Sequence, residues 1–425
     1  MLHQTIENER VCLLMLNEDV TCKFLRYIAV NTASDETTGT SPSTAGQFDL
    51  ANLLISELKE IGIPGEDIFF DSDHCYIYCR IKASSGIDVN TPKIGFIAHM
   101  DTSPEAPGKC TSPRFIENYD GKDIILGNGK ILSPENFPDL LLYKGQTLIT
   151  TDGSTLLGAD DKAGVAEIMC MAEHFMTHPE DLHGEIWLAF TPDEEIGEGT
   201  KHFDLTRFGA DFAYTIDGGR IGEISYENFN AASAVIKVTG RGVHPGDAYG
   251  KMINSIRIAG KIDSLIPDSE RPETTRDHEG FFHLTDISGA TEKTVMKYII
   301  RDHDMEKFNE KKSRMKSICE KVMSDNPGVI IDADISDTYY NMIEKIIPDN
   351  TAIIDRCTGA MEKVGITPFT EPIRGGTDGA TLSFMGLPCP NICSGGHNYH
   401  GVYEFICKES MEKITGLLIA IALCQ

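Results

Sequence analysis

Acidic and histidine side chains follow directly after short apolar runs at several places in this chain. His99 and Asp101 come at the end of the run Ile94–Ala98. A histidine in such a place can ligate a metal, while an Asp two residues further on fixes the tautomer of the imidazole by a hydrogen bond. Taken alone, however, this pair is better explained by a capping Asp beside a surface His.

Two acidic clusters have the same placement. Asp160 and Asp161 stand at the start of a predicted helix, where they can stabilise the helix dipole or bind a cation, and one carboxylate can bridge two cations. Asp193, Glu194 and Glu195 follow the next apolar run, and nothing structural requires three adjacent acids that repel one another. A nearby cation would relieve the repulsion and leave one of the three as a base, whereas a solvated acidic loop is the alternative.

The last two segments are weaker individually. Asp217 follows residues 213–216 in an Asp-Gly pair, which is common in turns, and His397 and His400 follow the final apolar run 388–393. If these runs are strands of one parallel sheet, all of the side chains converge in one crevice at the carboxyl ends of the strands. Mixed histidine and carboxylate ligands favour zinc or a similar metal, and a shared carboxylate is how a two-metal site is built.

Helical segments alternate with the apolar runs, which predicts an α/β domain with a mainly parallel sheet. Strands of such a sheet are buried on both faces, so they read as solid apolar runs. We expect helices at residues 19–30, 48–61 and 162–175, strands at 94–98, 185–190, 213–216 and 388–393, and a final helix that ends near Leu423.

From about Phe229 the order changes to strand, helix, strand, strand, helix, strand. This βαββαβ order is the split-βαβ arrangement of ferredoxin-like α+β domains. Its strands are expected at residues 234–239, 281–287, 294–301 and 329–335, and its helices at 252–265 and 305–323. We therefore expect an extension at residues 1–18, an α/β domain in two parts at 19–228 and 346–425, and an inserted domain at 229–345.

The composition excludes several classes of protein. The chain has 425 residues, of which 41% are hydrophobic and 24% charged, as is ordinary for a globular protein of two or three domains. Its 65 acidic and 38 basic side chains give a formal charge of −27, so we expect neither nucleic acid nor a membrane surface as a partner. Without a secretory signal, and with twelve cysteines expected as buried free thiols, the protein is expected to be cytoplasmic.

As an ordered set, these motifs resemble the co-catalytic zinc exopeptidase family, which includes aminoacylases, glutamate-releasing carboxypeptidases and aminopeptidases. Four longer strings are most similar to the tripeptide aminopeptidases of that family: TLLGADDKAG at 155–164, VHPG at 243–246, PIRGGTDGA at 372–380 and NYHG at 398–401. The resemblance extends from about Asp19 to the C-terminus. It implies a zinc-exopeptidase catalytic domain with an inserted ferredoxin-like lid, and a cytoplasmic enzyme that removes the N-terminal residue from tripeptides.

The resemblance also implies a ligand set. His99 and Asp217 would hold one metal, Glu195 and His400 the other, and Asp160 would bridge both. The expected cofactor is two Zn²⁺ ions per subunit, for which Co²⁺ or Mn²⁺ can substitute because both accept this ligand set.

Further roles follow from the same resemblance. Asp101 would orient the metal-binding histidine beside it, and Glu194 would be the general base that takes a proton from a water activated by the two metals. In the inserted domain, His244 would stabilise the oxyanion. Arg374, with Arg301 as a second candidate, would pair with the terminal carboxylate of the peptide and so count its length; structural salt bridges are the alternative for both.

Some alternatives stay open. His397 stands where an aromatic side chain is expected and competes with His400 as a ligand, although the spacing to Glu404 favours His400. The alternative activity is that of a carboxypeptidase or N-acyl amino acid deacylase of the same fold. A non-catalytic metal-bound binding module would lack the general base, which Glu194 supplies. The sequence does not determine the native metal, the side chain preferred at the released residue, the role of the extension, or whether the lids form a homodimer.

Overall fold

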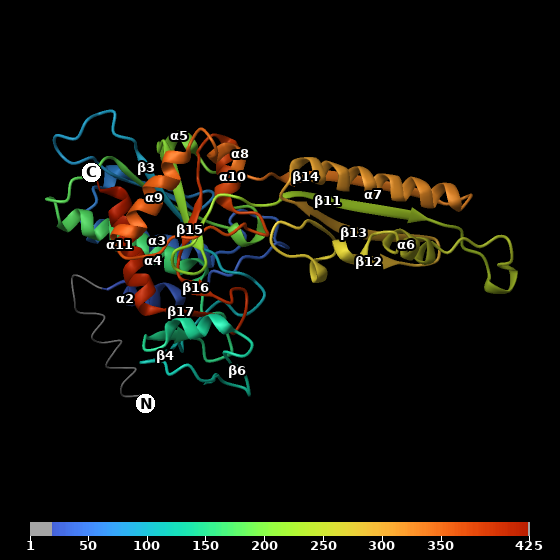
Figure 1. Cartoon of the computed structure of the whole chain (residues 1–425), viewed down its shortest axis with the longest axis horizontal. Helices are drawn as coiled ribbons and strands as arrows, with labels where there is room; N and C mark the ends of the chain where they lie inside the picture. Colours follow the sequence, from blue (N-terminus) through green and yellow to red (C-terminus); the bar gives the residue numbers. More distant parts are fainter. Residues whose placement is uncertain (1–18, 424–425) are drawn as a thin grey trace. The chain divides into compact units, whose positions relative to one another are not determined.

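The computed structural model describes residues 19–423, which form two compact units (Figure 1). The first unit comprises the described residues up to Tyr226, Lys345–Glu371, and the residues from Leu382 onward. The second comprises Glu227–Glu344 and Pro372–Thr381. The expected extension at residues 1–18 lies outside the described residues. Each unit is described by itself.

A seven-stranded sheet forms the framework of the first unit. Its strand order is β1-β2-β8-β3-β9-β15-β10. The four strands from β8 to β15 run parallel, and antiparallel strands extend the sheet at both edges. The predicted α/β fold with a mainly parallel sheet is thus confirmed, with a parallel centre. The strands are β1 (Ile68–Asp71), β2 (Tyr76–Ile81), β3 (Ile94–His99), β8 (Ile186–Thr191), β9 (Phe212–Gly218), β10 (Ile224–Ser225) and β15 (Asn391–Cys393).

Both faces of this sheet are covered, which explains the solid apolar runs. Every residue of β3 and β8 is buried. Because successive side chains of a strand point to opposite faces, Phe96 and Leu188 join a large core, whereas Ile97 and Trp187 join a smaller cluster that includes Phe208.

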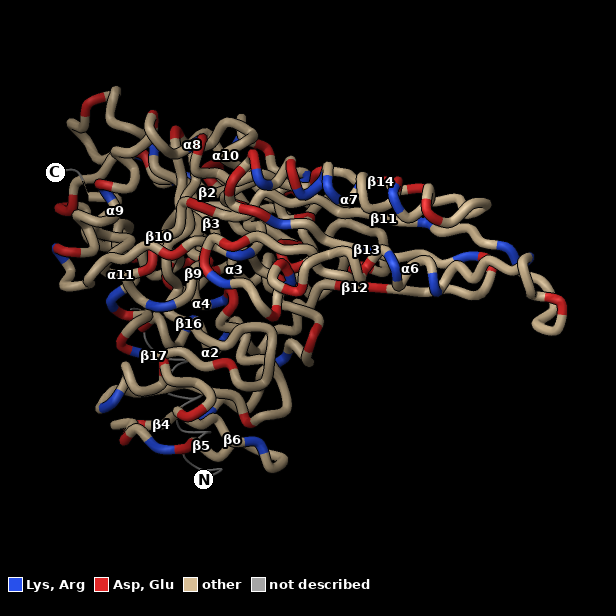
Figure 2. Tube along the Cα trace, turned by 45° about the vertical axis from the view of Figure 1, so that its right-hand side comes forward, with Lys and Arg blue, Asp and Glu red and all other residues tan. Residues whose placement is uncertain are grey.

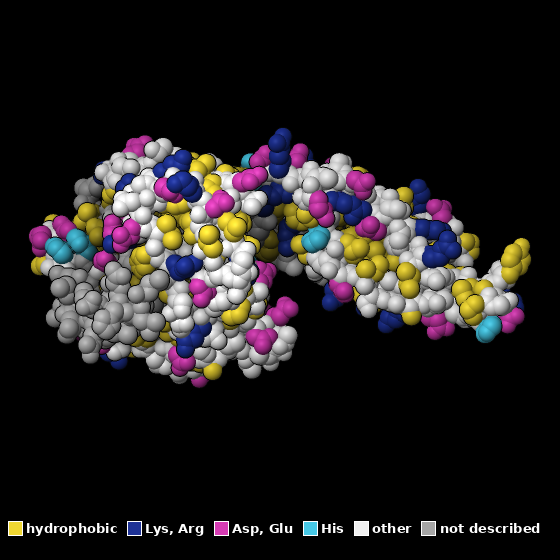
Figure 3. Space-filling model, turned by 90° about the horizontal axis from the view of Figure 1, so that it is seen from below, with side chains coloured by type: hydrophobic (Ala, Val, Ile, Leu, Met, Phe, Trp, Pro, Cys, Tyr) yellow, Lys and Arg dark blue, Asp and Glu magenta, His cyan; other side chains and the backbone are white. Residues whose placement is uncertain are grey.

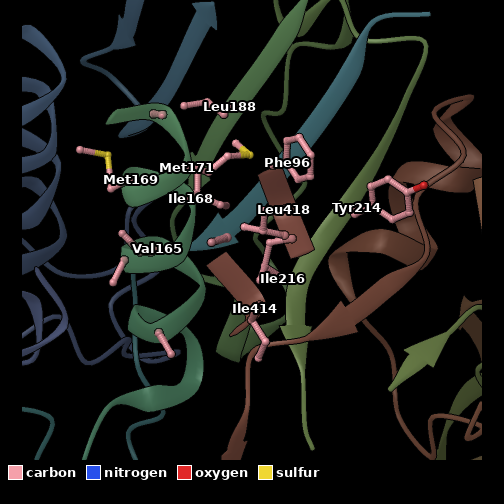
Figure 4. Packing of buried hydrophobic residues seen from close by; sticks show 14 of the residues in the cluster. Phe96, Val165, Ile168, Met169, Met171, Leu188, Tyr214, Ile216, Ile414 and Leu418 are labelled. Atoms are coloured by element: carbon pink, nitrogen blue, oxygen red, sulfur yellow. The ribbon is translucent and has the colours of Figure 1, made fainter. Parts of the chain in front are cut away.

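Helices pack on the large core, as Figure 4 shows for Ile168 of one helix and Leu418 of another, whose side chains meet the strands of the sheet. The helices that contribute most to this core are α2 (Val20–Ile28), α3 (Gly46–Glu60), α4 (Ala159–Thr177), α9 (Thr351–Lys363) and α11 (Lys408–Ala422). On the other face lies the short helix α5 (Leu205–Phe208). Two further short helices, α8 (Ile343–Ile346) and α10 (Asp378–Met385), span boundaries between the units in the sequence.

Local chemistry sets the helix ends. The helix α2 begins at Val20 because the side chain of Asp19 accepts a hydrogen bond from the N–H of Cys22 at 2.9 Å. The helix α4 begins three residues before its predicted start, but Asp160 and Asp161 in its first turn have non-helical backbone angles.

A second, smaller sheet in the first unit was not predicted. Its strands are antiparallel in the order β16-β17-β7-β4, namely β4 (Arg114–Ile116), β7 (Leu148–Thr150), β16 (Gly396–His397) and β17 (Phe405–Cys407), and a separate hairpin joins β5 (Ile124–Ile125) to β6 (Ile131–Leu132). Strands of two or three residues are too short to show an alternating pattern. The pairing of β17 with β7 brings the segment after residue 400 beside the segment that precedes Asp160.

The second unit has the predicted ferredoxin-like order. Its four antiparallel strands lie in the order β12-β13-β11-β14, and α6 and α7 pack with them around one apolar core. The elements are β11 (Asn230–Thr239), α6 (Ser255–Asp263), β12 (Phe281–Gly289), β13 (Lys293–Asp302), α7 (Met305–Asp325) and β14 (Ile330–Tyr339). The helix α6 starts later than predicted because the side chain of Asn254 caps it. The unit also takes in Pro372–Thr381, within the expected second part of the α/β domain.

The surface carries the mixture of charged and apolar side chains that the composition indicates. Charged residues of both signs are distributed along both units (Figure 2), and the face in Figure 3 shows apolar side chains scattered among charged ones. Across residues 19–423, no helix combines the length and the apolar character that a membrane crossing requires. Within the described part of the chain, nine cysteines carry free thiols, and eight of them are buried.

The close packing of β3 gives a test of the fold. A Cβ atom at Gly95 would lie 2.5 Å from Cζ of Phe208 and 2.8 Å from Cβ of Ala213. We therefore expect Gly95→Ala to lower the free energy of unfolding by about 1–3 kcal/mol, as overpacked core substitutions do. Urea unfolding followed by the fluorescence of the single tryptophan, Trp187, measures this, since its ring is 6.3 Å from that of Phe208.

A matched control is Gly359→Ala in α9, where a Cβ meets nothing within 4 Å. Because alanine favours a helix over glycine, this change should leave stability unchanged or raise it by up to about 1 kcal/mol. Equal unfolding curves for the two variants would contradict the packing described for β3.

Candidate metal centre

The carboxyl ends of three neighbouring parallel strands carry the acidic and histidine side chains. His99 is the last residue of β3, Asp217 lies near the end of β9, and Glu195 stands in the single 3-10 turn, Glu194–Ile196, that follows β8. Asp160 comes from the start of α4 and His400 from the segment between β16 and β17. The expected convergence at one edge of the sheet is therefore present in the first unit.

Five side chains form two groups that share Asp160. His99 and Asp217 join it in one group, and Glu195 and His400 in the other; in each group one donor atom per residue lies within 4.8 Å of the others. Nε2 of His99 is 3.0 Å from Oδ1 of Asp160, and Nε2 of His400 is 3.3 Å from Oδ2 of Asp160. Asp160 thus turns one oxygen to each group.

The remaining distances complete the two groups. Nε2 of His99 is 3.5 Å from Oδ1 of Asp217, and Nε2 of His400 is 2.8 Å from Oε2 of Glu195. Each group therefore offers one imidazole nitrogen and two carboxylates, which is a donor set for zinc and for neighbouring divalent metals.

The electrostatics also fit bound cations. Oε1 of Glu195 is buried and has no hydrogen-bond partner within residues 19–423, an arrangement that is costly unless a cation or donor meets it. Burial, with the charge of Asp160, raises the pKa of Glu195 to about 7 and that of Asp217 to about 6. A divalent ion in each group would stabilise the ionised carboxylates, so the residues present fit a pair of metal ions.

Asp101 orients His99 and also holds the neighbouring turn. Nδ1 of His99 is 3.1 Å from the carbonyl oxygen of Asp101 and 3.3 Å from its Oδ1, so Nε2 faces Asp160. The two carboxylate oxygens of Asp101 accept the N–H groups of Glu194 at 3.0 Å and Glu195 at 3.2 Å. One buried carboxylate therefore fixes both a candidate ligand and the turn that carries the candidate base.

The three consecutive acids after β8 have three different environments. Asp193 is buried and accepts hydrogen bonds from Ser43 and from Nε2 of Gln47, while its own N–H donates to Gln47 Oε1 at 3.1 Å. Glu195 belongs to a candidate metal group, whereas Glu194 belongs to neither group. The sequence did not indicate that Asp193 anchors the turn.

His400, and not His397, reaches the metal groups. The ring of His397 stacks on Phe405 with centroids 4.7 Å apart, and its Nε2 is 2.6 Å from the hydroxyl oxygen of Tyr143. Burial lowers the pKa of His397 to about 4. This histidine packs in the small sheet, which removes the competition that the sequence left open.

Two buried acids that the sequence analysis did not assign support the centre. Oδ2 of Asp161 accepts the N–H of His99 at 3.2 Å, and Oδ1 accepts the N–H of Gly164 at 3.2 Å. Glu404 accepts four backbone N–H groups from residues 157–160. A glutamate flanked by Tyr403 and the apolar strand β17 is a signal of burial that would have drawn attention to Glu404.

The other predicted site residues belong to the second unit. His244 is exposed, and its Nδ1 accepts the N–H of Gly246 at 3.1 Å. The guanidinium of Arg374 donates to the carbonyl oxygens of Asp277 at 2.6 Å and Glu279 at 3.1 Å. Much of the donor capacity of Arg374 therefore holds the loop around residues 275–279.

Arg301 is bound less fully. Its guanidinium lies 5.0 Å from the centre of the Tyr339 ring and donates to the carbonyl oxygen of Ile300 at 3.3 Å. Burial lowers the pKa of Arg301. Among the ion pairs of residues 19–423, neither Arg301 nor Arg374 has a carboxylate partner, so the structure gives no support to the alternative of structural salt bridges.

Comparison with known proteins identifies relatives over nearly the whole length. Residues 151–423 match the model of peptidase family M20/M25/M40. A protein of Alkaliphilus oremlandii named Peptidase T is 52% identical over 94% of this chain and 97% of its own length. A Peptidase T of Clostridium perfringens is 54% identical over 94% of this chain and 97% of its own length. These matches confirm the resemblance that the motifs predicted.

Solved structures with the same fold have lower identity. An aminopeptidase, PepT, of Bacillus cereus superposes with a TM-score of 0.73 at 22% identity, covering 95% of this chain and 97% of its own. A tripeptidase of Staphylococcus aureus gives 0.75 at 20% identity over 95% and 96% of the two chains. A dinuclear metal-binding peptidase of Bacillus subtilis from the M20 family gives 0.64 at 13% identity over 95% and 96%.

The protonation of the two groups predicts how metal binding depends on pH. Hydrogen bonds to Asp160 and Glu195 raise the pKa of His400 to about 11. Burial lowers the pKa of His99, but its carboxylate neighbours raise it well above the ordinary value. Both imidazoles are therefore protonated at pH 7 when no ion is bound, and they must lose a proton to ligate a metal.

We expect binding of two divalent ions at pH 7 to release about two to three protons per chain: one from each imidazole and a further part from Glu195, whose pKa is about 7. The affinity for the ions should rise with pH until the two histidines are deprotonated. Calorimetric titrations in two buffers of different ionisation enthalpy measure the release. His400→Asn should remove about one of these protons. The control is His74→Asn, which should remove none, because His74 contacts Asp71 of β1 and belongs to neither metal group. Heats that do not depend on the buffer would contradict this assignment.

Proposed function

This chain belongs to peptidase family M20/M25/M40, and we propose that it is a metal-dependent aminopeptidase that removes the N-terminal residue from tripeptides. The observation that carries this proposal is the pair of donor groups sharing Asp160, with the carboxylate-bearing turn of Glu194 beside them. The relatives named Peptidase T, similar along nearly the whole chain, support the tripeptide as substrate.

The two groups of the first unit would hold two ions, with Asp160 between them. Bound there, divalent ions would polarise the scissile carbonyl and lower the pKa of the attacking water. We propose zinc as the native metal, with cobalt or manganese as substitutes, because a set of two imidazoles and three carboxylates accepts all three.

Glu194 is proposed as the general base. Its neighbour Glu195 belongs to a metal group, while Glu194 belongs to neither, so its carboxylate is not committed to ligation in this arrangement. The N–H of Glu194 is fixed by Asp101, which also orients His99. A base held in this way would take a proton from the attacking water and deliver it to the leaving amine.

Three residues of the second unit are proposed to act on the substrate. His244 would stabilise the oxyanion. Arg374 and Arg301 would bind the C-terminal carboxylate of the peptide, and so limit its length. Of the two, Arg301 has the larger unused donor capacity, because Arg374 already binds the carbonyl oxygens of Asp277 and Glu279. A cytoplasmic location and a homodimer through the inserted units complete the proposal.

The substrate is tested by product analysis. The metal-reconstituted protein should convert Ala-Ala-Ala to Ala and Ala-Ala, and should leave Ala-Ala and N-acetylated Ala-Ala-Ala uncleaved, because the activity needs a free amino end and a tripeptide. Cleavage of the acetylated peptide would replace this proposal with that of a deacylase or carboxypeptidase. No cleavage of any of the three by a protein with two bound ions would favour a non-catalytic metal-binding module.

The base is tested by Glu194→Gln. This variant should bind two ions as the unmodified chain does, but its kcat for Ala-Ala-Ala should fall by about 10²–10⁴-fold, the usual contribution of a general base. Glu198→Gln in the same loop is a matched control, because Glu198 pairs with Lys201 and belongs to neither metal group; its kcat should not change. Retained turnover in Glu194→Gln, or loss of metal with it, would reject the assignment.

A further inference from the structure

The carboxylate of Glu404 is bound by four consecutive backbone N–H groups. Oε2 accepts from Leu157 at 2.7 Å and Gly158 at 2.9 Å, and Oε1 accepts from Ala159 at 2.6 Å and Asp160 at 3.1 Å. Glu404 is only 1% exposed.

This contact takes the place of an ordinary helix cap. The first N–H groups of a helix have no partner within the helix. At the start of α4 the capping position is Gly158, which has no side chain to accept a bond, and Asp160 and Asp161 have non-helical backbone angles. Glu404 reaches the same N–H groups from 244 residues further along the chain, as the separation from Asp160 shows.

The segment 400–404 contacts both the side chain and the backbone N–H of Asp160. His400 faces the side chain of Asp160, with Nε2 3.3 Å from Oδ2, and Glu404 accepts the backbone N–H of Asp160. The side chain of Asp160 otherwise contacts His99, itself a candidate ligand, at 3.0 Å. The placement of the shared carboxylate therefore depends on the backbone that Glu404 holds.

The ionised form of Glu404 is the one that fits. All four groups that contact the carboxylate of Glu404 are N–H donors, so the proton of a neutral carboxyl group would point at another N–H and would have no acceptor. Hydrogen bonds to a charged group are stronger than those between neutral groups, so the carboxylate restrains this segment strongly.

We propose that Glu404 is a positioning residue of the metal centre, which holds residues 157–160 so that Asp160 can be shared between two ions. This inference rests on the proposed function. The group of Asp160, Glu195 and His400 depends on it most, because both Asp160 and the segment 400–404 move if the clamp is lost. The group of His99 and Asp217 keeps two ligands that Glu404 does not contact.

The test is a Co²⁺ titration of the metal-free protein, followed by the visible absorption of bound cobalt. In Glu404→Gln one oxygen becomes an amide nitrogen, so two of the four N–H groups face a donor. We expect the first equivalent of Co²⁺ to bind within about threefold of the unmodified affinity, and the second to bind about 10–100-fold more weakly, as when the partner of a metal ligand is removed. Turnover of Ala-Ala-Ala should return as Co²⁺ is raised, because Glu194 is intact.

Glu409→Gln is the matched control. Glu409 also accepts a backbone N–H with both oxygens, from Thr147 at 3.1 and 3.0 Å, but it belongs to neither metal group. It should bind both equivalents of Co²⁺ as the unmodified chain does. Equal weakening of both ions in Glu404→Gln, unchanged binding of both, or the same loss in Glu409→Gln would overturn the proposal.

Two safeguards separate the possible failures. If circular dichroism shows that Glu404→Gln does not fold, the second variant is Glu404→Asp, which keeps the charge on a shorter side chain. It must bind the second equivalent of Co²⁺ selectively more weakly, as expected for Glu404→Gln. If Glu404→Asp binds both equivalents with the affinity of the unmodified protein, or if it does not fold, the proposal is overturned. If the unmodified protein binds two ions but does not cleave the tripeptide, the proposed function fails, and the cobalt titration still decides the role of Glu404.

Discussion

The structure of the first unit around its candidate metal centre depends on one electrostatic constraint: a single carboxylate, that of Asp160, has to serve two groups that each contain a further carboxylate. Asp217 and Glu195 lie on either side of it, and burial makes their ionisation costly. Without cations, the two histidines supply the balancing charge, as the raised pKa of His400 indicates. Metal ions bound in the two candidate groups would take over that function, because they would replace the protons held there.

Holding the candidate ligands in this arrangement involves further carboxylates that belong to neither metal group. Asp101 fixes His99 and the turn after β8, Asp161 holds the N–H of His99, and Glu404 binds the start of α4. Each of these carboxylates accepts backbone N–H groups, so each restrains main chain as well as side chains. Much of the acidity concentrated in these motifs therefore serves to hold the donor atoms in place, which is what a preorganised centre needs.

Sequence reasoning reached the parts of this arrangement that periodicity and motif order encode. Solid apolar runs such as that of β3 predict buried parallel strands, and parallel strands place their carboxyl ends together, which is why His99 and Asp217 could be placed in one crevice in advance. Their assignment to the same metal came from the family resemblance. The strand pairing of β17 with β7 could not be found, because two- and three-residue strands carry no period. The roles of Asp193 and Glu404 were missed for a related reason: their partners, Ser43 and the backbone of residues 157–160, are close only in the folded chain.

The pairing of β17 with β7 also determines when the centre can form during synthesis. His400 and Glu404 follow the second unit in the sequence, whereas the residues they contact, Asp160 and its neighbours, are made at least 240 residues earlier. Contacts of such separation form late, and the second unit must be translated before them. A nascent chain that has not reached residue 400 therefore carries the whole first group, but in the second group it lacks His400. The second donor group can thus be complete only after residues from both parts of the first unit have been translated.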